Sequence, residues 1–134
     1  MTIVYVAARF DQRERLAKEV AEPLIAAGHI VTSSWLRLGE DSLPLGAADI
    51  ENNLELAAKH GLACRADVHR AEAVAVFTDR SSSTGGYHVE VGLGMAWGRQ
   101  LHIVGPRLNI FHALPGVTHH PDIATFLTAW GCVA

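Results

Sequence analysis

The sequence predicts an α/β fold, in which a doubly wound parallel β-sheet of about five strands has helices on both faces. Short runs of β-branched and apolar residues alternate with longer helical stretches, the order expected of repeated β-α-β units. Residues 72–77, Glu-Ala-Val-Ala-Val-Phe, are almost continuously apolar, as in a strand buried on both faces. A chain of 134 residues is expected to form one domain, residues 1–134.

The first half of the chain begins with a strand at residues 2–7, which are mostly β-branched or aromatic. A helix should follow from residue 11, with Leu16, Val20 and Leu24 on one face, and end at Gly28. Pro23 should bend this helix or remove one of its hydrogen bonds. A second strand is expected at 29–33 and a long loop at 35–46. The composition of residues 47 to about 71 is helical, and Gly61 marks where that helix could break.

The second half repeats the pattern. Strand 72–77 is followed by a polar loop at 78–86 and a helix at 87–97. Strand 101–104 leads into a second long loop at 105–116, a length often associated with function. An edge strand is expected at 117–120, before a last helix that begins at Pro121 or Asp122 and ends near Trp130.

Composition excludes several classes of function. The net charge of −3, with scattered Lys and Arg, argues against a nucleic-acid-binding protein. No stretch resembles a leader or a membrane span, so we expect a cytoplasmic protein without a membrane partner. Cys64 and Cys132 are isolated and the histidines lack metal-ligand spacing, so no metal site, cofactor or disulfide is expected. The hydrophobic fraction of 49% suggests that the protein is an oligomer.

The loops that follow the strands are where ligands bind in an open parallel sheet. The loop after residues 72–77 ends in Ser83, Thr84, Gly85 and Gly86 at a predicted helix start, where backbone N–H groups and the helix dipole favour an anion such as phosphate. A solvated polar loop would explain the same residues equally well.

Glu90 is the one formally charged residue between Arg80 and Arg99. A carboxylate in the first turn of a helix is often explained by the helix dipole alone, yet one facing a cleft would suit a nucleophile, and the dipole should keep it ionised. We expect Val89, Leu93 and Ala96 to face the sheet, with Glu90 directed along the cleft.

Two further residues could share this cleft. Asp67 lies one turn before the strand at 72–77, although a solvated carboxylate between Arg65 and Arg70 is the alternative. Tyr5 lies in the first strand, where a tyrosine of the core is the alternative.

These residues together resemble the nucleoside 2-deoxyribosyltransferase family, which includes the 2′-deoxynucleoside 5′-monophosphate N-hydrolases. The resemblance is carried by Tyr5 in Val-Tyr-Val-Ala-Ala, by Asp67, and by Gly-Tyr-His-Val-Glu-Val-Gly-Leu-Gly-Met-Ala-Trp-Gly-Arg-Gln at 86–100. It implies a flavodoxin-like fold, usually in a homodimer or a multiple of dimers, and cleavage of the bond between a (deoxy)ribose and its base. Glu90 would attack the anomeric carbon, Tyr5 would orient Glu90, and Asp67 would contact the sugar or assist departure of the base.

The resemblance also bears on the substrate. Asn109 resembles a residue that the family lends to the site of the neighbouring subunit. Thr84 stands where the transferases tend to carry an aspartate and the monophosphate hydrolases a serine, which favours a 5′-phosphate. The hydrolases' Ser-x-Arg-Gly-Gly stretch after the first strand is absent, so Arg9 or Arg13 would have to replace it.

The leading hypothesis is therefore hydrolysis of a nucleoside 5′-monophosphate, with nucleosides or nucleotides as the small-molecule partners. Base exchange between free nucleosides is the enzymatic alternative, and a nucleotide-sensing domain without turnover is the alternative of another class.

Overall fold

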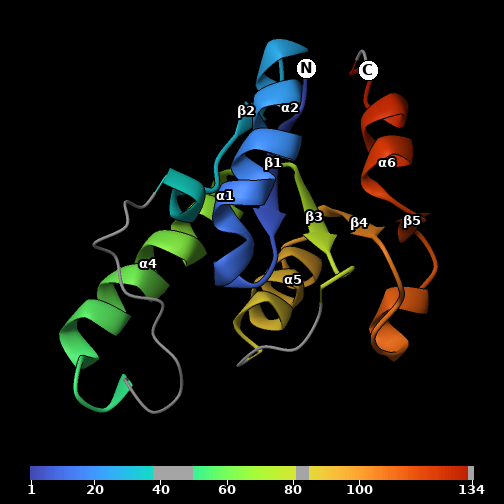
Figure 1. Ribbon diagram of the computed structural model, residues 1–134. Helices are drawn as coiled ribbons and strands as arrows, with labels where there is room; N and C mark the ends of the chain where they lie inside the picture. Colours follow the sequence, from blue (N-terminus) through green and yellow to red (C-terminus); the bar gives the residue numbers. More distant parts are fainter. Residues whose placement is uncertain (38–49, 81–84, 133–134) are drawn as a thin grey trace.

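The computed structural model describes residues 1–37, 50–80 and 85–132 and contains a sheet of five parallel strands (Figure 1). The strand order is β2-β1-β3-β4-β5. The strands are β1 (Ile3–Ala7), β2 (Ile30–Val31), β3 (Ala73–Phe77), β4 (Gln100–Val104) and β5 (Thr118–His120). This order is that of the flavodoxin-like fold, in which the direction of strand addition reverses between β1 and β3. The predicted single-domain α/β fold is confirmed.

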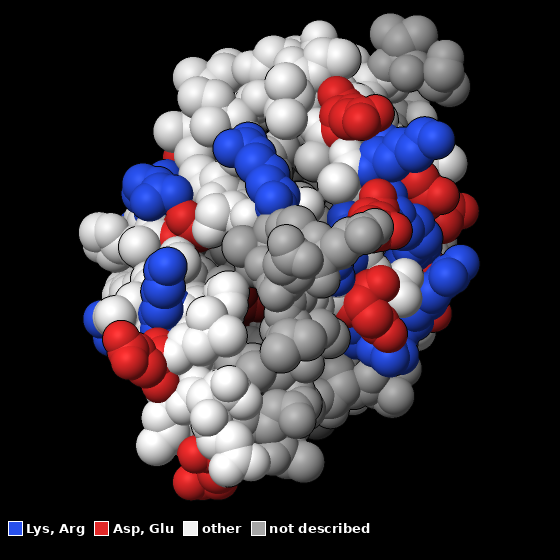
Figure 2. Space-filling view, turned by 60° about the vertical axis from the view of Figure 1, so that its left-hand side comes forward, with Lys and Arg blue, Asp and Glu red and all other residues white. Residues whose placement is uncertain are grey.

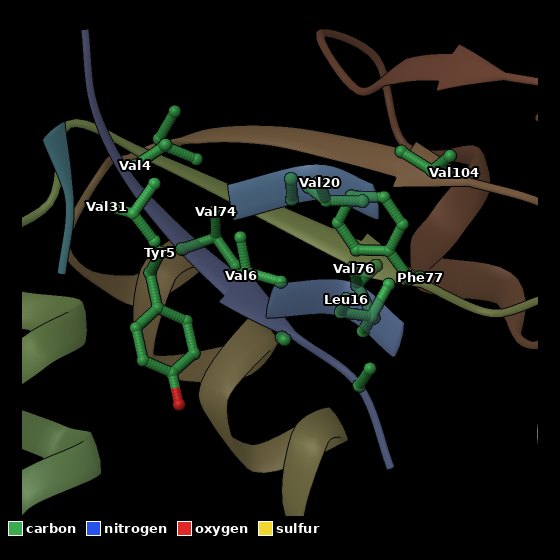
Figure 3. Close-up of a cluster of buried hydrophobic side chains, with 14 of the residues drawn as sticks. Val4, Tyr5, Val6, Leu16, Val20, Val31, Val74, Val76, Phe77 and Val104 are labelled. Carbon is green, nitrogen blue, oxygen red and sulfur yellow. The ribbon is translucent and has the colours of Figure 1, made fainter. Parts of the chain in front are cut away.

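The two faces of the sheet meet different helices. Val74 of β3 faces α5 (Gly86–Ala96), where a Cβ at Gly94 would lie 2.7 Å from its side chain. Phe77 of the same strand makes a T-shaped contact with Phe126 of α6 (Ile123–Ala129), at 5.5 Å between ring centroids. Tyr5 pairs in register with Val74 and therefore points to the α5 side, as Figure 3 shows. The first strand thus carries a tyrosine toward the helices that will form the cleft.

The helical segment after β1 is divided by a π-turn. It consists of η1 (Phe10–Gln12), α1 (Arg13–Leu16), the π-helical η2 (Ala17–Ala21) and α2 (Glu22–Ala26). Pro23 has no backbone N–H, and the widened turn lies directly before it, with the N–H of Glu22 donating to the carbonyl of Ala17. Leu16, Val20 and Leu24 are fully buried on one face, as their spacing predicted.

Helix α4 (Leu54–Arg70) is continuous, so the predicted weakness at Gly61 does not break it. Helix α5 follows Gly85, whose φ of 90° lies in the left-handed region that favours glycine. The predicted orientation of α5 was wrong in part: Val89 is 63% exposed and Ala96 is exposed, while Tyr87, Val91 and Gly94 face the core. The absence of a side chain at Gly94 lets the helix approach Val74, and this close approach sets the buried face.

The chain is completed by η3 (Ser34–Arg37) after β2 and by η4 (Ile110–Ala113) between β4 and β5. In the described parts of the chain, no helix combines the length and the apolar character needed to cross a membrane. Acidic and basic side chains are interspersed on the face drawn in Figure 2, in keeping with the scattered charges of the sequence.

Candidate active site

A cleft of about 390 Å³ opens between α4 and α5, next to the carboxyl end of β1. Its size is within the range of pockets that hold small molecules. The lining comes from the segment after β1, from η3 and from the facing sides of the two helices. These residues are Ala8, Arg9, Phe10, Trp35, His60, Gly61, Cys64, Arg65, Gly86, Tyr87, Val89, Glu90 and Leu93. The cleft lies where an open parallel sheet with this strand order binds its ligands.

Glu90 lines the cleft, and the hydroxyl of Tyr5 donates a hydrogen bond to its Oε2 atom. Tyr5 is itself fully buried, so its hydroxyl is fixed by the packing of β1 against the helices. The two residues are 85 positions apart in the chain, and the fold brings them together as the resemblance implied. A tyrosine that holds one carboxylate oxygen restricts the direction in which the other can point.

Burial raises the pKa of Glu90 from its ordinary value of 4.5 to about 7. Hydrogen bonds from Tyr5 and Cys64 favour the ionised form and lower the pKa, whereas the charge of Asp67 raises it. The sequence-based expectation that the helix dipole keeps Glu90 ionised was wrong. Helix α5 has no acidic residue in its first turn, since Glu90 is its fifth residue, and desolvation outweighs the other effects. At neutral pH the carboxyl is therefore present in both protonation states.

Cys64 is isolated in the sequence and was not predicted to belong to a site. The structure places it on the α4 wall of the cleft, where burial and the neighbouring Glu90 raise its pKa to about 12. The thiol thus stays protonated and can act as a hydrogen-bond donor but not as a thiolate nucleophile.

Asp67 is buried beside the cleft rather than in its lining. Its Oδ2 atom accepts hydrogen bonds from the backbone N–H of Ser34, at 2.9 Å, and from the Ser34 hydroxyl. Its Oδ1 atom accepts from the guanidinium of Arg70, one turn further along α4. These contacts fix the carboxylate between α4 and η3, close enough for its charge to act on Glu90.

The cleft also contains cationic and aromatic side chains. Arg9 follows β1 and forms an ion pair with Asp11 at 2.6 Å, with its side chain 30% exposed. His60 and Arg65 line the cleft from α4, and Phe10 and Trp35 line it from the other side, with 6.2 Å between their ring centroids. The α4 residues of the lining were not predicted from the sequence. Their spacing of three or four residues along one helix, at 60, 61, 64 and 65, was the signal that could have identified them.

Of the four loop residues predicted to bind phosphate, the structure describes the two glycines. Gly85 precedes α5, and Gly86, the first residue of the helix, lines the cleft. Ser83 and Thr84 lie outside the described residues, so their predicted roles stay predictions. No three His, Cys, Asp or Glu side chains come together as a metal site among the residues that the structure describes.

Asn109 and Glu90 of the same chain do not line the same cleft. Its Oδ1 atom caps η4 by accepting from the N–H of Phe111 at 3.0 Å. Asn109 lines a second groove, of about 470 Å³, at a different side of α5. The residues of this groove are His88, Val91, Gly92, Met95, Asn109, Phe111 and His112.

Comparison with known proteins yields a structural likeness. The sequence matches no protein-family model and no curated protein. The structure is similar to that of a CMP N-glycosidase, BcmB, from Clostridium botulinum, with a TM-score of 0.58 and 12% sequence identity. The match covers 96% of this chain and 97% of the other. The two chains share a fold. At 12% identity, this similarity shows a shared fold and nothing further about family or activity.

Proposed function

We propose that this protein cleaves the N-glycosidic bond of a nucleoside 5′-monophosphate, with 2′-deoxyribose as the expected sugar, and releases the free base. The observation that carries the proposal is Glu90 in the cleft between α4 and α5, held by the Tyr5 hydroxyl. A carboxylate fixed beside a small-molecule cleft is the group that retaining glycosidases use as their nucleophile. A likeness of fold to a CMP N-glycosidase over nearly the whole of both chains supports the same reading.

In the proposed reaction, ionised Glu90 attacks the anomeric carbon of the sugar. The bond from carbon to the base nitrogen breaks, its electron pair goes to the base, and a glycosyl ester forms on Glu90. A proton must reach the departing base, and water then hydrolyses the ester to return the free carboxylate. Tyr5 donates to Oε2, so we assign the attack to Oε1. We assign Asp67 to the sugar or to assisting departure of the base, as the family resemblance implies, from its fixed position beside the cleft, where its charge acts on Glu90.

The 5′-phosphate is assigned to the start of α5. Gly86 brings the N-terminal end of this helix to the cleft, and the N–H groups and dipole of a helix start favour an anion. Arg9 supplies a cation on the other side of the cleft. Gly85 supports the turn through its positive φ, and Ser83 and Thr84 would complete the site with hydroxyl groups.

We propose that the protein acts as a homodimer in which Asn109 serves the site of the neighbouring subunit. Asn109 lies away from Glu90 in its own chain, next to Ile110 and Phe111, which are 80% and 54% exposed. Large apolar side chains that are exposed on a single chain often mark the surface that a partner chain covers.

Release of free base from a panel of nucleosides and nucleoside monophosphates, followed by chromatography, tests the proposal. We expect release from monophosphates by the wild type and a loss of several orders of magnitude in Glu90→Gln. Base exchange between free nucleosides would favour a transferase. Nucleotide binding with no turnover of any substrate would contradict an enzymatic function.

A further inference from the structure

Gly61 is an unusual residue for its place in the fold. It lies in the interior of α4, a helix of 17 residues that runs through it without a break. Apart from proline, glycine is the residue that favours a helix interior least. A glycine that weakens a helix calls for a reason in its surroundings.

Packing among the described residues does not supply that reason. Outside its own stretch of α4, a Cβ atom built at Gly61 would meet no described atom within 4 Å, and the backbone there is not in the left-handed region. Gly94 shows the contrast, because its Cβ would lie 2.7 Å from Val74 and the helix could not approach the sheet. Alanine at position 61 would therefore fit the folded chain and improve the helix.

The open space in front of Gly61 is the cleft itself. Gly61 lines it together with Glu90, and Cys64, one turn further along α4, stands close enough to Glu90 for its thiol to donate a hydrogen bond to the carboxylate. The helix projects away from the sheet toward its N-terminus (Figure 1), with Leu54 and Leu62 exposed and Val68 buried. Gly61 thus lies further from the sheet than Cys64, by about 4.5 Å measured along the helix axis.

The geometry of the displacement reaction indicates which part of the substrate lies next to Gly61. In the proposed reaction, the nucleophile and the leaving group lie on opposite sides of the anomeric carbon. Glu90 attacks from the deep end of the cleft, where Tyr5 holds it. The base must therefore lie on the outer side, at the level of Gly61.

We propose that Gly61 leaves room for the leaving nucleobase and so determines which bases the cleft accepts. This inference rests on the proposed function. The bare backbone of α4 offers a flat surface to a planar ring, and a side chain at position 61 would occupy the space of that ring. Larger bases should depend on this space more than smaller ones.

Substitutions of increasing size test the inference. Gly61→Ala should raise Tm by about 2–4 °C through helix propensity, yet weaken nucleotide binding. Gly61→Leu should weaken binding of nucleoside monophosphates by roughly tenfold or more, and purines more than pyrimidines. Ala63→Leu is the matched control, because Ala63 is exposed on the same helix outside the cleft lining, and it should change binding less than about twofold.

Binding is measured by calorimetry in a Glu90→Gln background, so that no turnover interferes, with ribose 5-phosphate as the ligand that lacks a base. Gly61→Leu should bind ribose 5-phosphate as the parent does. Equal losses for ribose 5-phosphate and nucleotides, or unchanged nucleotide binding, would overturn the inference. Nucleotide binding with these losses but no base release by the wild type would refute the glycosidase proposal alone. A parent that binds no nucleotide would refute both.

Discussion

Replacement of Glu90 by glutamine should stabilise the protein increasingly as pH rises. Burial holds the pKa of Glu90 at about 7 in the folded state, against an ordinary value of 4.5. Between these two values the folded protein keeps a proton that the unfolded chain releases, so folding stability falls as pH increases through this window. A pKa difference of about 2.5 units between the folded and unfolded states corresponds to a loss of about 3 kcal/mol in folding stability. This loss is complete above pH 7. Glutamine keeps an oxygen that can accept from Tyr5 and carries no charge, so Glu90→Gln should be free of this penalty.

Urea unfolding of wild type and Glu90→Gln at pH 5, 6, 7 and 8, at one protein concentration, measures the effect. The stability difference between the two proteins should grow in favour of Glu90→Gln by about 2–3 kcal/mol from pH 5 to pH 8. Glu22→Gln, which removes an exposed carboxylate from α2, is the control for loss of charge. A stability difference that stays constant from pH 5 to pH 8 would show that Glu90 is not a buried carboxyl with a raised pKa.

Three further predictions concern the site and the assembly. Tyr5→Phe removes a hydrogen-bond donor that favours ionised Glu90. The acid limb of the pH profile of kcat/KM should therefore move to higher pH by about one unit. A limb at the same pH would show that Tyr5 does not act on Glu90. Thr84→Val should weaken the binding of monophosphate substrates by roughly tenfold or more, and that of free nucleosides far less, because a hydrogen bond to phosphate is lost. Equal losses for both kinds of substrate would remove the phosphate assignment. Sedimentation should show a dimer at micromolar concentration, with activity reduced in Asn109→Ala while the dimer persists. A fully active monomer would exclude a site shared between subunits.

The order of the elements could be predicted because each has a local signal. The β-branched run of β1, the apolar run of β3 and the four-residue spacing of Leu16, Val20 and Leu24 depend only on neighbouring residues. The fold confirmed them, with boundaries shifted by a few residues. Strand β2 is the exception, with two residues instead of the five expected.

The chemistry of the site could be predicted only in part. The contact of Tyr5 with Glu90 followed from a family resemblance, while the raised pKa of Glu90 did not, because desolvation depends on α4 closing over α5. The buried face of α5 was misjudged for a similar reason. Apolar side chains indicated Val89, whereas the close approach at Gly94 determines the packing, and a glycine gives no hydrophobic signal.

The central claim is that Glu90 carries the sugar during the reaction, and trapping that intermediate tests it most directly. A 2′-fluoro analogue of the substrate slows hydrolysis of a glycosyl ester and lets it accumulate. Mass spectrometry of wild-type protein quenched with this analogue should find the mass of the fluorinated sugar on the peptide that contains Glu90, and on no peptide of Glu90→Gln. Release of base with no covalent adduct, or an adduct on another residue, would contradict the account.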